Sequence, residues 1–192
     1  MNFWERILYL LQEYGTSYLK GAGTTLVIAL VSTAIGCLIG FIVGIIQTIP
    51  EDKHRDSLLK KIVLKIVKII LKIYVEVFRG TPMIVQAVFI YYGAAQIFNI
   101  QMGMWQSAFL IVSINTGAYM AESVRGGIIS VDPGQTEGAK AIGMTHVQTM
   151  TNVILPQAFR NILPQIGNNL IINIKDTSVL SIISIVDLFF VH

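Results

Sequence analysis

The stretch from Gly21 to Pro50, GAGTTLVIALVSTAIGCLIGFIVGIIQTIP, is 30 residues long and contains no charged side chain. A helix rises about 1.5 Å per residue, so about 20 apolar residues cross the hydrocarbon core of a membrane. A second uncharged stretch, from Gly80 to Ala121, is too long for one span and is interrupted at Asn99–Gly103. The two stretches predict membrane spans over residues 25–48, 76–98 and 104–122.

The composition supports a membrane protein. Of 192 residues, 54% are hydrophobic and 13% are charged, and the net charge is +3. Soluble domains contain about 25% charged residues, and a soluble chain this apolar could not cover its surface with polar groups. A disordered chain and a soluble enzyme are therefore disfavoured. We expect an all-α, polytopic transmembrane bundle that forms one domain over residues 1–192, with a further, less apolar span over about 157–176.

The distribution of charge predicts the orientation in the membrane. Residues 51–79 contain eight basic and four acidic side chains, and their net charge of +4 accounts for the whole positive excess. Cytoplasmic loops carry such an excess of Lys and Arg. We therefore expect this segment in the cytoplasm, the N-terminus outside, and residues 123–152 in the cytoplasm again.

Two amphipathic segments flank the first span. Five lysines share one side of a helical wheel, namely Lys60, Lys61, Lys65, Lys68 and Lys72. They predict a basic cytoplasmic helix over residues 51–73 at the membrane interface, leading into the second span and facing anionic headgroups. Residues 1–20 form an external amphipathic segment in this interpretation, with Trp4 as an aromatic anchor. Nucleic acid is not an expected partner, because no separate soluble domain presents the basic residues.

Small residues predict a close helix contact. Gly36, Gly40 and Gly44 recur every four residues of the first span. In lipid, such spacing lets another helix approach closely, within the chain or in a partner.

The loop over residues 130–156, here called the elbow, reads as two short helices. Asp132 can cap the first helix and Pro133 suits its first position, while Gly143 can end it in a left-handed conformation. Thr145 can cap the second helix, with Gln148 in the reciprocal position of a capping box. A helix–glycine–helix loop between two spans suits a rigid lever pressed by another protein better than it suits an enzyme site.

The elbow resembles the EAA loop of ABC importer permeases. Glu137-Gly138-Ala139 is followed after three residues by Gly143 and after nine more by Val153-Ile154-Leu155-Pro156, where Gly138 and Val153 replace the usual Ala and Ile. Further motifs are similar to those of the polar amino-acid (histidine/glutamine-type) permease family: Glu76-Val77-Phe78-Arg79-Gly80-Thr81-Pro82, Ala121-Glu122-Ser123-Val124-Arg125-Gly126-Gly127 and Lys175-Asp176-Thr177-Ser178.

The resemblance implies an architecture and a set of partners. It implies a type I ABC importer permease fold of about five spans, the last apparently incomplete in this sequence, in a bacterial inner membrane. Glu137, Gly138, Ala139 and Gly143 would form the coupling helix that docks on a cytoplasmic ABC ATPase. A second permease subunit, identical or different, and an extracellular substrate-binding protein or domain would complete the importer.

The chain itself is expected to be non-catalytic. It lacks the Gly-x-x-x-x-Gly-Lys-Ser/Thr loop that cradles nucleotide phosphates, so it cannot hold ATP in that way. ATP and Mg²⁺ would be bound by the partner ATPase, and we expect no cofactor on this chain. The three histidines are scattered, and no metal site is expected.

A polar stripe marks the candidate substrate site. Gln165, Asn169, Asn173 and Asp176 recur at helical spacing, and polar groups at membrane depth are costly unless they face a partner or a wet cavity. We expect Asn169, Asn173 and Asp176 to contact an amino-acid substrate, and the resemblance adds Thr81. Because Asn169 is neutral, a neutral or acidic polar amino acid is favoured. The alternative is an interhelical hydrogen-bond seam, with Asp176 paired to Lys175 or Arg79.

Two charge pairs have i, i+3 spacing. Glu76 with Arg79, and Glu122 with Arg125, are expected to form helical ion pairs, and a gate that re-pairs between states is the alternative. Two other classes of function remain open for the whole chain. One is a carrier or channel that works without an ATPase, and the other is a membrane anchor or signal-relay subunit.

Overall fold

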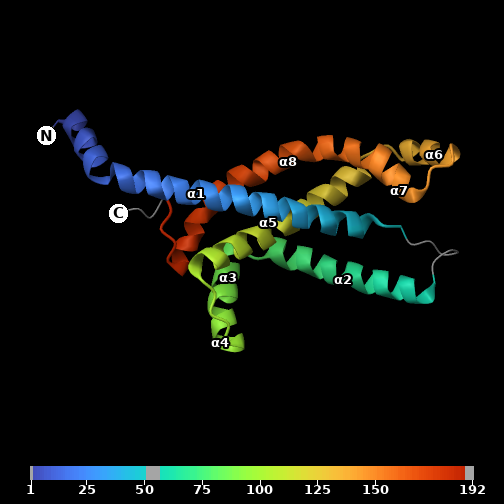
Figure 1. Ribbon diagram of the computed structural model, residues 1–192, viewed down its shortest axis with the longest axis horizontal. Coiled ribbons are helices and arrows are strands. Elements are labelled where there is room, and N and C mark those ends of the chain that lie inside the picture. Colours follow the sequence, from blue (N-terminus) through green and yellow to red (C-terminus); the bar gives the residue numbers. More distant parts are fainter. Residues whose placement is uncertain (1, 51–56, 189–192) are drawn as a thin grey trace.

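The computed structural model describes residues 2–50 and 57–188, and every regular element within them is helical (Figure 1). The all-α prediction is confirmed. In Figure 1 the long helices run along one axis, and the short helices α6 and α7 lie at one end of them. The same end receives the last turn of α1 and the first turn of α2, so the elbow and the start of α2 lie at one end of the molecule.

Helix α1 spans Phe3–Thr48 and begins with a capping box between Asn2 and Glu5, in which the Asn2 amide donates to Glu5 Oε2 at 2.8 Å. The predicted external segment and first span are therefore one continuous helix, although its first turns bend away from the rest (Figure 1). Among the described helices, only the part Gln12–Thr48 is both long and apolar enough to cross a membrane by length and hydropathy alone, and Met83–Phe98 is a shorter apolar segment.

Helix α2 spans Leu58–Gly80 and corrects a predicted boundary. Residues 58–73 are helical as expected, whereas residues 51–56 lie outside the described part. The helix does not stop at 73 or become a span over 76–98. It continues to Gly80 and buries Val75, with Tyr74 partly buried beside it, against Ile39 and Val43 of α1 and Ala121 of a later helix. The prediction failed because Pro82 has no backbone N–H for α2 and disfavours a helical conformation at Thr81, so the element ends inside the uncharged run.

The chain leaves the helical conformation between Gly80 and Met83, here called the helix break, and a short apolar arm follows. It consists of α3 (Met83–Val88), a π-helical turn (Phe89–Gly93) and α4 (Ala94–Phe98), and Figure 1 shows it projecting to one side of the long helices. Asn99 ends the arm in the left-handed conformation, with φ of 54°, and the next helix starts at Met104. The predicted interruption at Asn99–Gly103 is therefore confirmed.

Helix α5 (Met104–Ile129) is the central element. Helix α1 packs along it through Gly36, Gly40 and Gly44, here called the glycine seam. A Cβ at Gly36 would lie 2.6 Å from Thr116 Cβ, and one at Gly44 would lie 2.7 Å from Val124 Cβ. Gly40 meets Met120 still more closely. Each glycine removes a side chain where the facing helix approaches, so the predicted close helix contact is confirmed and lies within the chain.

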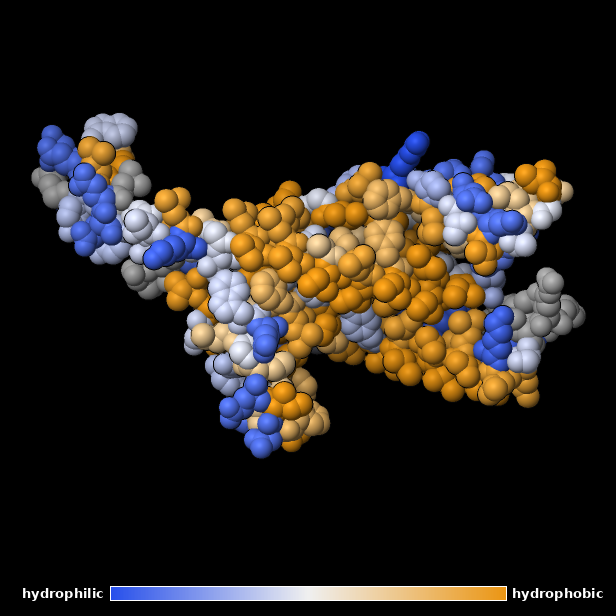
Figure 2. Space-filling view, in the orientation of Figure 1, coloured by the Kyte–Doolittle hydropathy of each residue, from blue (hydrophilic) through white to orange (hydrophobic). Residues whose placement is uncertain are grey.

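The remaining elements form the elbow and the last long helix. They are α6 (Pro133–Ala141), α7 (His146–Thr149), a π-helical turn (Met150–Ile154), α8 (Leu155–Asp176) and a 3₁₀ helix (Thr177–Ile183). Figure 2 shows hydrophobic residues covering the middle of the molecule, with hydrophilic residues gathered toward its ends and at the tip of the arm. That distribution suits a molecule whose middle faces lipid.

Candidate functional site

The elbow is held by the local interactions that its sequence predicts. Asp132 caps α6 by accepting a hydrogen bond from the Gly134 amide at 2.7 Å. Gly143 has φ of 85°, and the Gly143 and Met144 amides donate to the Lys140 and Ala139 carbonyls, which is the Schellman arrangement. Thr145 and Gln148 then form the expected capping box around the start of α7. No long-range contact is needed to define this turn.

The tip of the elbow is exposed and partly apolar. Glu137 and Gly138 face solvent, while Ala139 is buried and α6 packs on the turn Met150–Ile154 of the same elbow. Ile142 is 79% exposed and Val147 is 69% exposed, beside the turn at Gly143. The end of α6 presents the carboxylate of Glu137, and the adjoining turn and α7 add the exposed side chains of Ile142 and Val147. A surface of this kind is suited to docking in a groove of another protein.

The break between α2 and α3 is stabilised by an amide network. Gln86 Nε2 donates to the Phe78 and Thr81 carbonyls and to Thr81 Oγ1, each at 2.9 Å. Asn115 Nδ2 of α5 donates to Gln86 Oε1 at 3.0 Å and to the Phe78 carbonyl at 3.3 Å. Carbonyls at the end of a helix lack intrahelical partners, and buried ones are costly when unpaired. The network therefore pairs the carbonyls of Phe78 and Thr81 where the helix is interrupted between Gly80 and Met83.

Two asparagines of the polar stripe are buried between helices. Asn173 Nδ2 donates to Thr33 Oγ1 of α1 at 2.8 Å and to Thr116 Oγ1 of α5 at 2.9 Å. Asn169 Nδ2 lies 3.0 Å from Met120 Sδ of α5. The seam expected as the alternative is thus present at Asn173. The pairing expected for Asp176 is absent from the described residues, because neither Lys175 nor Arg79 forms an ion pair with it.

The break, α5 and α8 enclose one polar cavity of about 180 Å³. All four residues expected to contact a substrate line it, namely Thr81, Asn169, Asn173 and Asp176. Gln165, the other member of the stripe, does not. Asn115, Thr116 and Tyr119 of α5 complete its polar lining with groups that were not singled out from the sequence. Asn115 and Gln86 could have been found by the argument used for α8, since both are polar residues inside an uncharged run.

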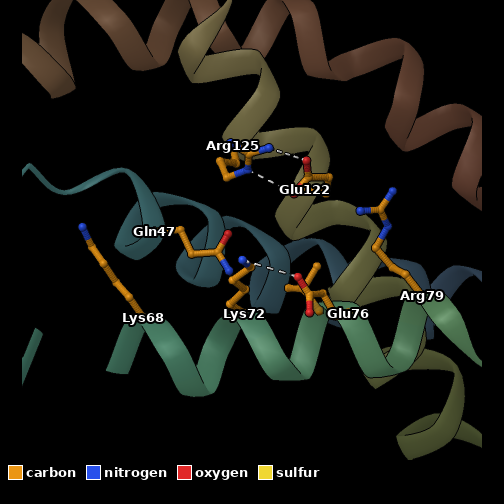
Figure 3. A pocket seen from close by; sticks show the side chains of 8 residues that line it. Gln47, Lys68, Lys72, Glu76, Arg79, Glu122 and Arg125 are labelled. Atoms are coloured by element: carbon orange, nitrogen blue, oxygen red, sulfur yellow. Dashed lines mark hydrogen bonds and ion pairs between the residues drawn. The ribbon is translucent and has the colours of Figure 1, made fainter. Parts of the chain in front are cut away.

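A second, larger crevice of about 480 Å³ lies between the end of α1, α2 and α5 (Figure 3). It contains both predicted charge pairs, but only one of them forms. Arg125 binds Glu122 through two hydrogen bonds, Nε to Oε2 at 3.1 Å and Nη2 to Oε1 at 2.5 Å.

The predicted pairing of Glu76 with Arg79 is wrong. Glu76 pairs with Lys72 at 3.6 Å, and the Arg79 guanidinium lies over the Tyr119 ring, 5.7 Å from its centroid. Glu76 and Lys72 are four residues apart and project over the same part of α2, whereas the ring of Tyr119 on α5 offers Arg79 a cation–π contact. Over the described residues, no group of three or more His, Cys, Asp or Glu side chains is placed to hold a metal ion.

Comparison with known proteins identifies the family. Residues 63–190 match the family described as binding-protein-dependent transport system inner membrane component. The chain is 42% identical over 115 residues to the glutamine transport system permease protein of Escherichia coli K12, an alignment that covers 59% of this chain and 52% of that protein. It is 45% identical over 115 residues to the L-cystine transport system permease protein of Bacillus subtilis, with 60% and 49% covered.

The solved structures agree with this. A crystal structure of an amino acid ABC transporter with histidines is similar with a TM-score of 0.80 and 34% identity, over 98% of this chain and 79% of that one. An inward-facing methionine ABC transporter shares the fold, with a TM-score of 0.69 and 21% identity over 95% and 77% of the two chains. The matches span about half the length of the curated relatives. The chain belongs to the family of binding-protein-dependent transport system inner membrane components.

Proposed function

We propose that the chain is the membrane-spanning permease subunit of an ATP-driven importer of polar amino acids, with neutral or acidic substrates favoured. The observation that carries the proposal is the polar cavity, where Thr81, Asn169, Asn173 and Asp176 converge from the helix break and α8. Transporters commonly place substrate at such interrupted helices, because the non-helical backbone is tolerated where it lines a cavity.

The lining of the polar cavity supports an amino acid as the substrate. Asp176 provides one carboxylate for an α-ammonium group, and the amide and hydroxyl groups around it can bind a carboxylate or a polar side chain. Position 169 is a neutral Asn, which gives a cationic side chain no additional acid to pair with. Relatives named as glutamine, arginine and L-cystine permeases make an amino acid the class to test, and their variety leaves the choice of side chain to experiment.

The elbow supports the proposed coupling to an ATPase. Glu137, Gly138 and Ile142 of the elbow are exposed at the end of the long helices. This position suits docking on cytoplasmic ABC ATPase subunits that bind ATP and Mg²⁺. A substrate-binding protein would deliver the amino acid at the opposite end, and a second permease subunit would complete the path. The N-terminus is then outside, in a bacterial inner membrane.

Uptake by the reconstituted importer tests the proposal. The permease, its ATPase and its binding protein are placed in proteoliposomes, and labelled substrate is competed with a panel of amino acids. ATP-dependent uptake that glutamine-like or acidic amino acids compete for is the expected result. A preference for lysine or arginine would contradict the favoured substrate class. Uptake without any ATPase would indicate an autonomous carrier, and ATPase binding without uptake of any solute would indicate an anchor or relay subunit.

A further inference from the structure

The crevice of Figure 3 has an excess of positive charge that the proposed function does not use. Four cationic side chains line it, and two acidic ones. We call it the basic crevice and define it by its lining: Gln47, Lys68, Lys72, Val75, Glu76, Arg79, Glu122 and Arg125. Figure 3 shows α2 providing Lys68, Lys72, Glu76 and Arg79 on one side, with Glu122 and Arg125 of α5 opposite them. Its volume of about 480 Å³ is more than twice that of the polar cavity.

The acidic groups leave much of this charge uncompensated. Arg125 is neutralised by Glu122 in a two-bond pair, whereas Lys72 meets Glu76 at 3.6 Å with both side chains about two-thirds exposed or more. Lys68 donates one hydrogen bond to the Ile49 carbonyl at 2.6 Å, which leaves further N–H donors for another group. Within the described chain, Arg79 lies over the Tyr119 ring and makes no hydrogen bond or ion pair, and it interacts with Glu122 only at longer range.

The basic crevice lies toward the end of the molecule that holds the elbow. Gln47 is one residue from the end of α1, and Arg125 is about one turn from the end of α5. Beside the lysines, the neighbouring face of α2 exposes a row of aliphatic side chains: Ile62, Ile66, Ile69, Ile70 and Ile73. A charged crevice that adjoins an exposed apolar helix face matches both parts of a phospholipid, because basic pockets between helices on the cytoplasmic side bind anionic headgroups.

We propose that the basic crevice binds the phosphodiester headgroup of an anionic phospholipid of the inner leaflet, with the acyl chains along the isoleucine face of α2. Lys72 and Arg79 contact the phosphate, and Lys68 and Arg125 add to the positive field around it. A free phosphate ion has the same chemistry but lacks the acyl contacts, so a lipid is the occupant to which the two adjoining surfaces point.

Lipid retention by the purified full-length permease tests this. The detergent-solubilised protein is mixed with phosphatidylglycerol or phosphatidylcholine, and bound lipid is counted by native mass spectrometry. A parallel arm uses inorganic phosphate alone. Lys72→Gln removes a crevice cation whose side chain is 74% exposed, so the fold tolerates it. Lys65→Gln removes an exposed cation from the same helix but outside the crevice, and serves as the matched control.

The expected result is preferential binding of phosphatidylglycerol. Lys72→Gln weakens it about fivefold, Lys65→Gln leaves it near the unaltered level, and Glu76→Gln strengthens it because a competing acid is removed. Equal retention of the two lipids would overturn the proposal, as would an equal loss with Lys65→Gln, which indicates general surface attraction. Binding of inorganic phosphate without phosphatidylglycerol would overturn the assignment to a lipid. Uptake is not the readout, so the test is independent of the transported substrate.

Discussion

The two sides of α5 differ in packing: one side is in tight contact with α1, and the other lines two polar hollows. On one side Met120 and Val124 press against the glycine seam of α1, where a single added methyl group has no room. On the other side Asn115 and Tyr119 face the polar cavity, and Glu122 faces the basic crevice. The first side fixes the position of α5 by packing, and the second keeps polar groups accessible in a largely apolar molecule. One central helix therefore packs tightly on one side and lines both polar hollows on the other.

Overpacking the glycine seam has the largest expected effect on stability. Gly40→Leu places a side chain where Met120 already lies, and overpacked cores lose about 1–3 kcal/mol or more. We expect a large loss of folded protein and a lower melting temperature in detergent. Gly23→Leu is the matched control, because nothing lies within 4 Å of a Cβ at Gly23. Equal stability of the two variants would contradict the seam as the main contact between α1 and α5.

Removing the amide network at the helix break is expected to cost less. Gln86→Leu leaves the partly buried Thr81 carbonyl without its amide donor, while Asn115 still reaches the Phe78 carbonyl. An unpaired buried polar group costs about 1–3 kcal/mol. The melting temperature of the purified protein should fall accordingly, and uptake should fall with it because Thr81 lines the polar cavity. A variant with unchanged stability would show that the break does not depend on this network.

Neighbouring residues of α8 should separate packing from transport. Asn173→Ala removes hydrogen bonds to Thr33 and Thr116, so both stability, by about 1 kcal/mol, and uptake should decrease. Asp176→Asn leaves these bonds intact and removes the carboxylate of the polar cavity, so uptake efficiency should fall about tenfold or more at unchanged melting temperature. Full uptake by Asp176→Asn would place the substrate elsewhere.

The exposed charge pair gives the smallest expected effect. Glu76→Gln breaks a contact with Lys72 between side chains that are 67% and 74% exposed, and such pairs contribute about 0–1 kcal/mol. Glu122→Gln should cost more, because Arg125 then loses a two-bond partner at a site that is about one-third exposed. Chemical unfolding of the two variants side by side checks this order. A larger loss for Glu76→Gln would reverse our ranking of the two pairs.

Local signals in the sequence predicted the elbow well. Asp132, Gly143 and the Thr145–Gln148 capping box act over three or four residues, so no tertiary contact was needed to identify them. The glycine seam was also readable, because its spacing repeats along one helix face. Its partner helix, however, is set by tertiary packing and could not be read from the spacing.

One local signal and several tertiary contacts separate the structure from the expectations. The absence of charge alone predicts one span over residues 76–98, because it takes no account of the local stop signal at Pro82, just after the end of α2. Spacing of i, i+3 on α2 predicted a Glu76–Arg79 pair, but Tyr119 of α5 lies close enough to attract Arg79. Likewise, Asn115 and Gln86 meet across 29 positions of the chain, a contact that neither local sequence predicts.

Co-purification of the ABC ATPase with the permease tests the central claim most directly, namely that the elbow is the contact through which a nucleotide-driven partner moves this chain. Glu137→Arg reverses the exposed charge at the tip of the elbow. The control is Gln135→Arg, which places an arginine at an exposed position two residues earlier on α6. We predict that the ATPase is retained by the unaltered permease and by Gln135→Arg, and is lost together with uptake in Glu137→Arg. Full retention of the ATPase by Glu137→Arg, or labelling of the elbow from the outside of intact cells, would contradict the account.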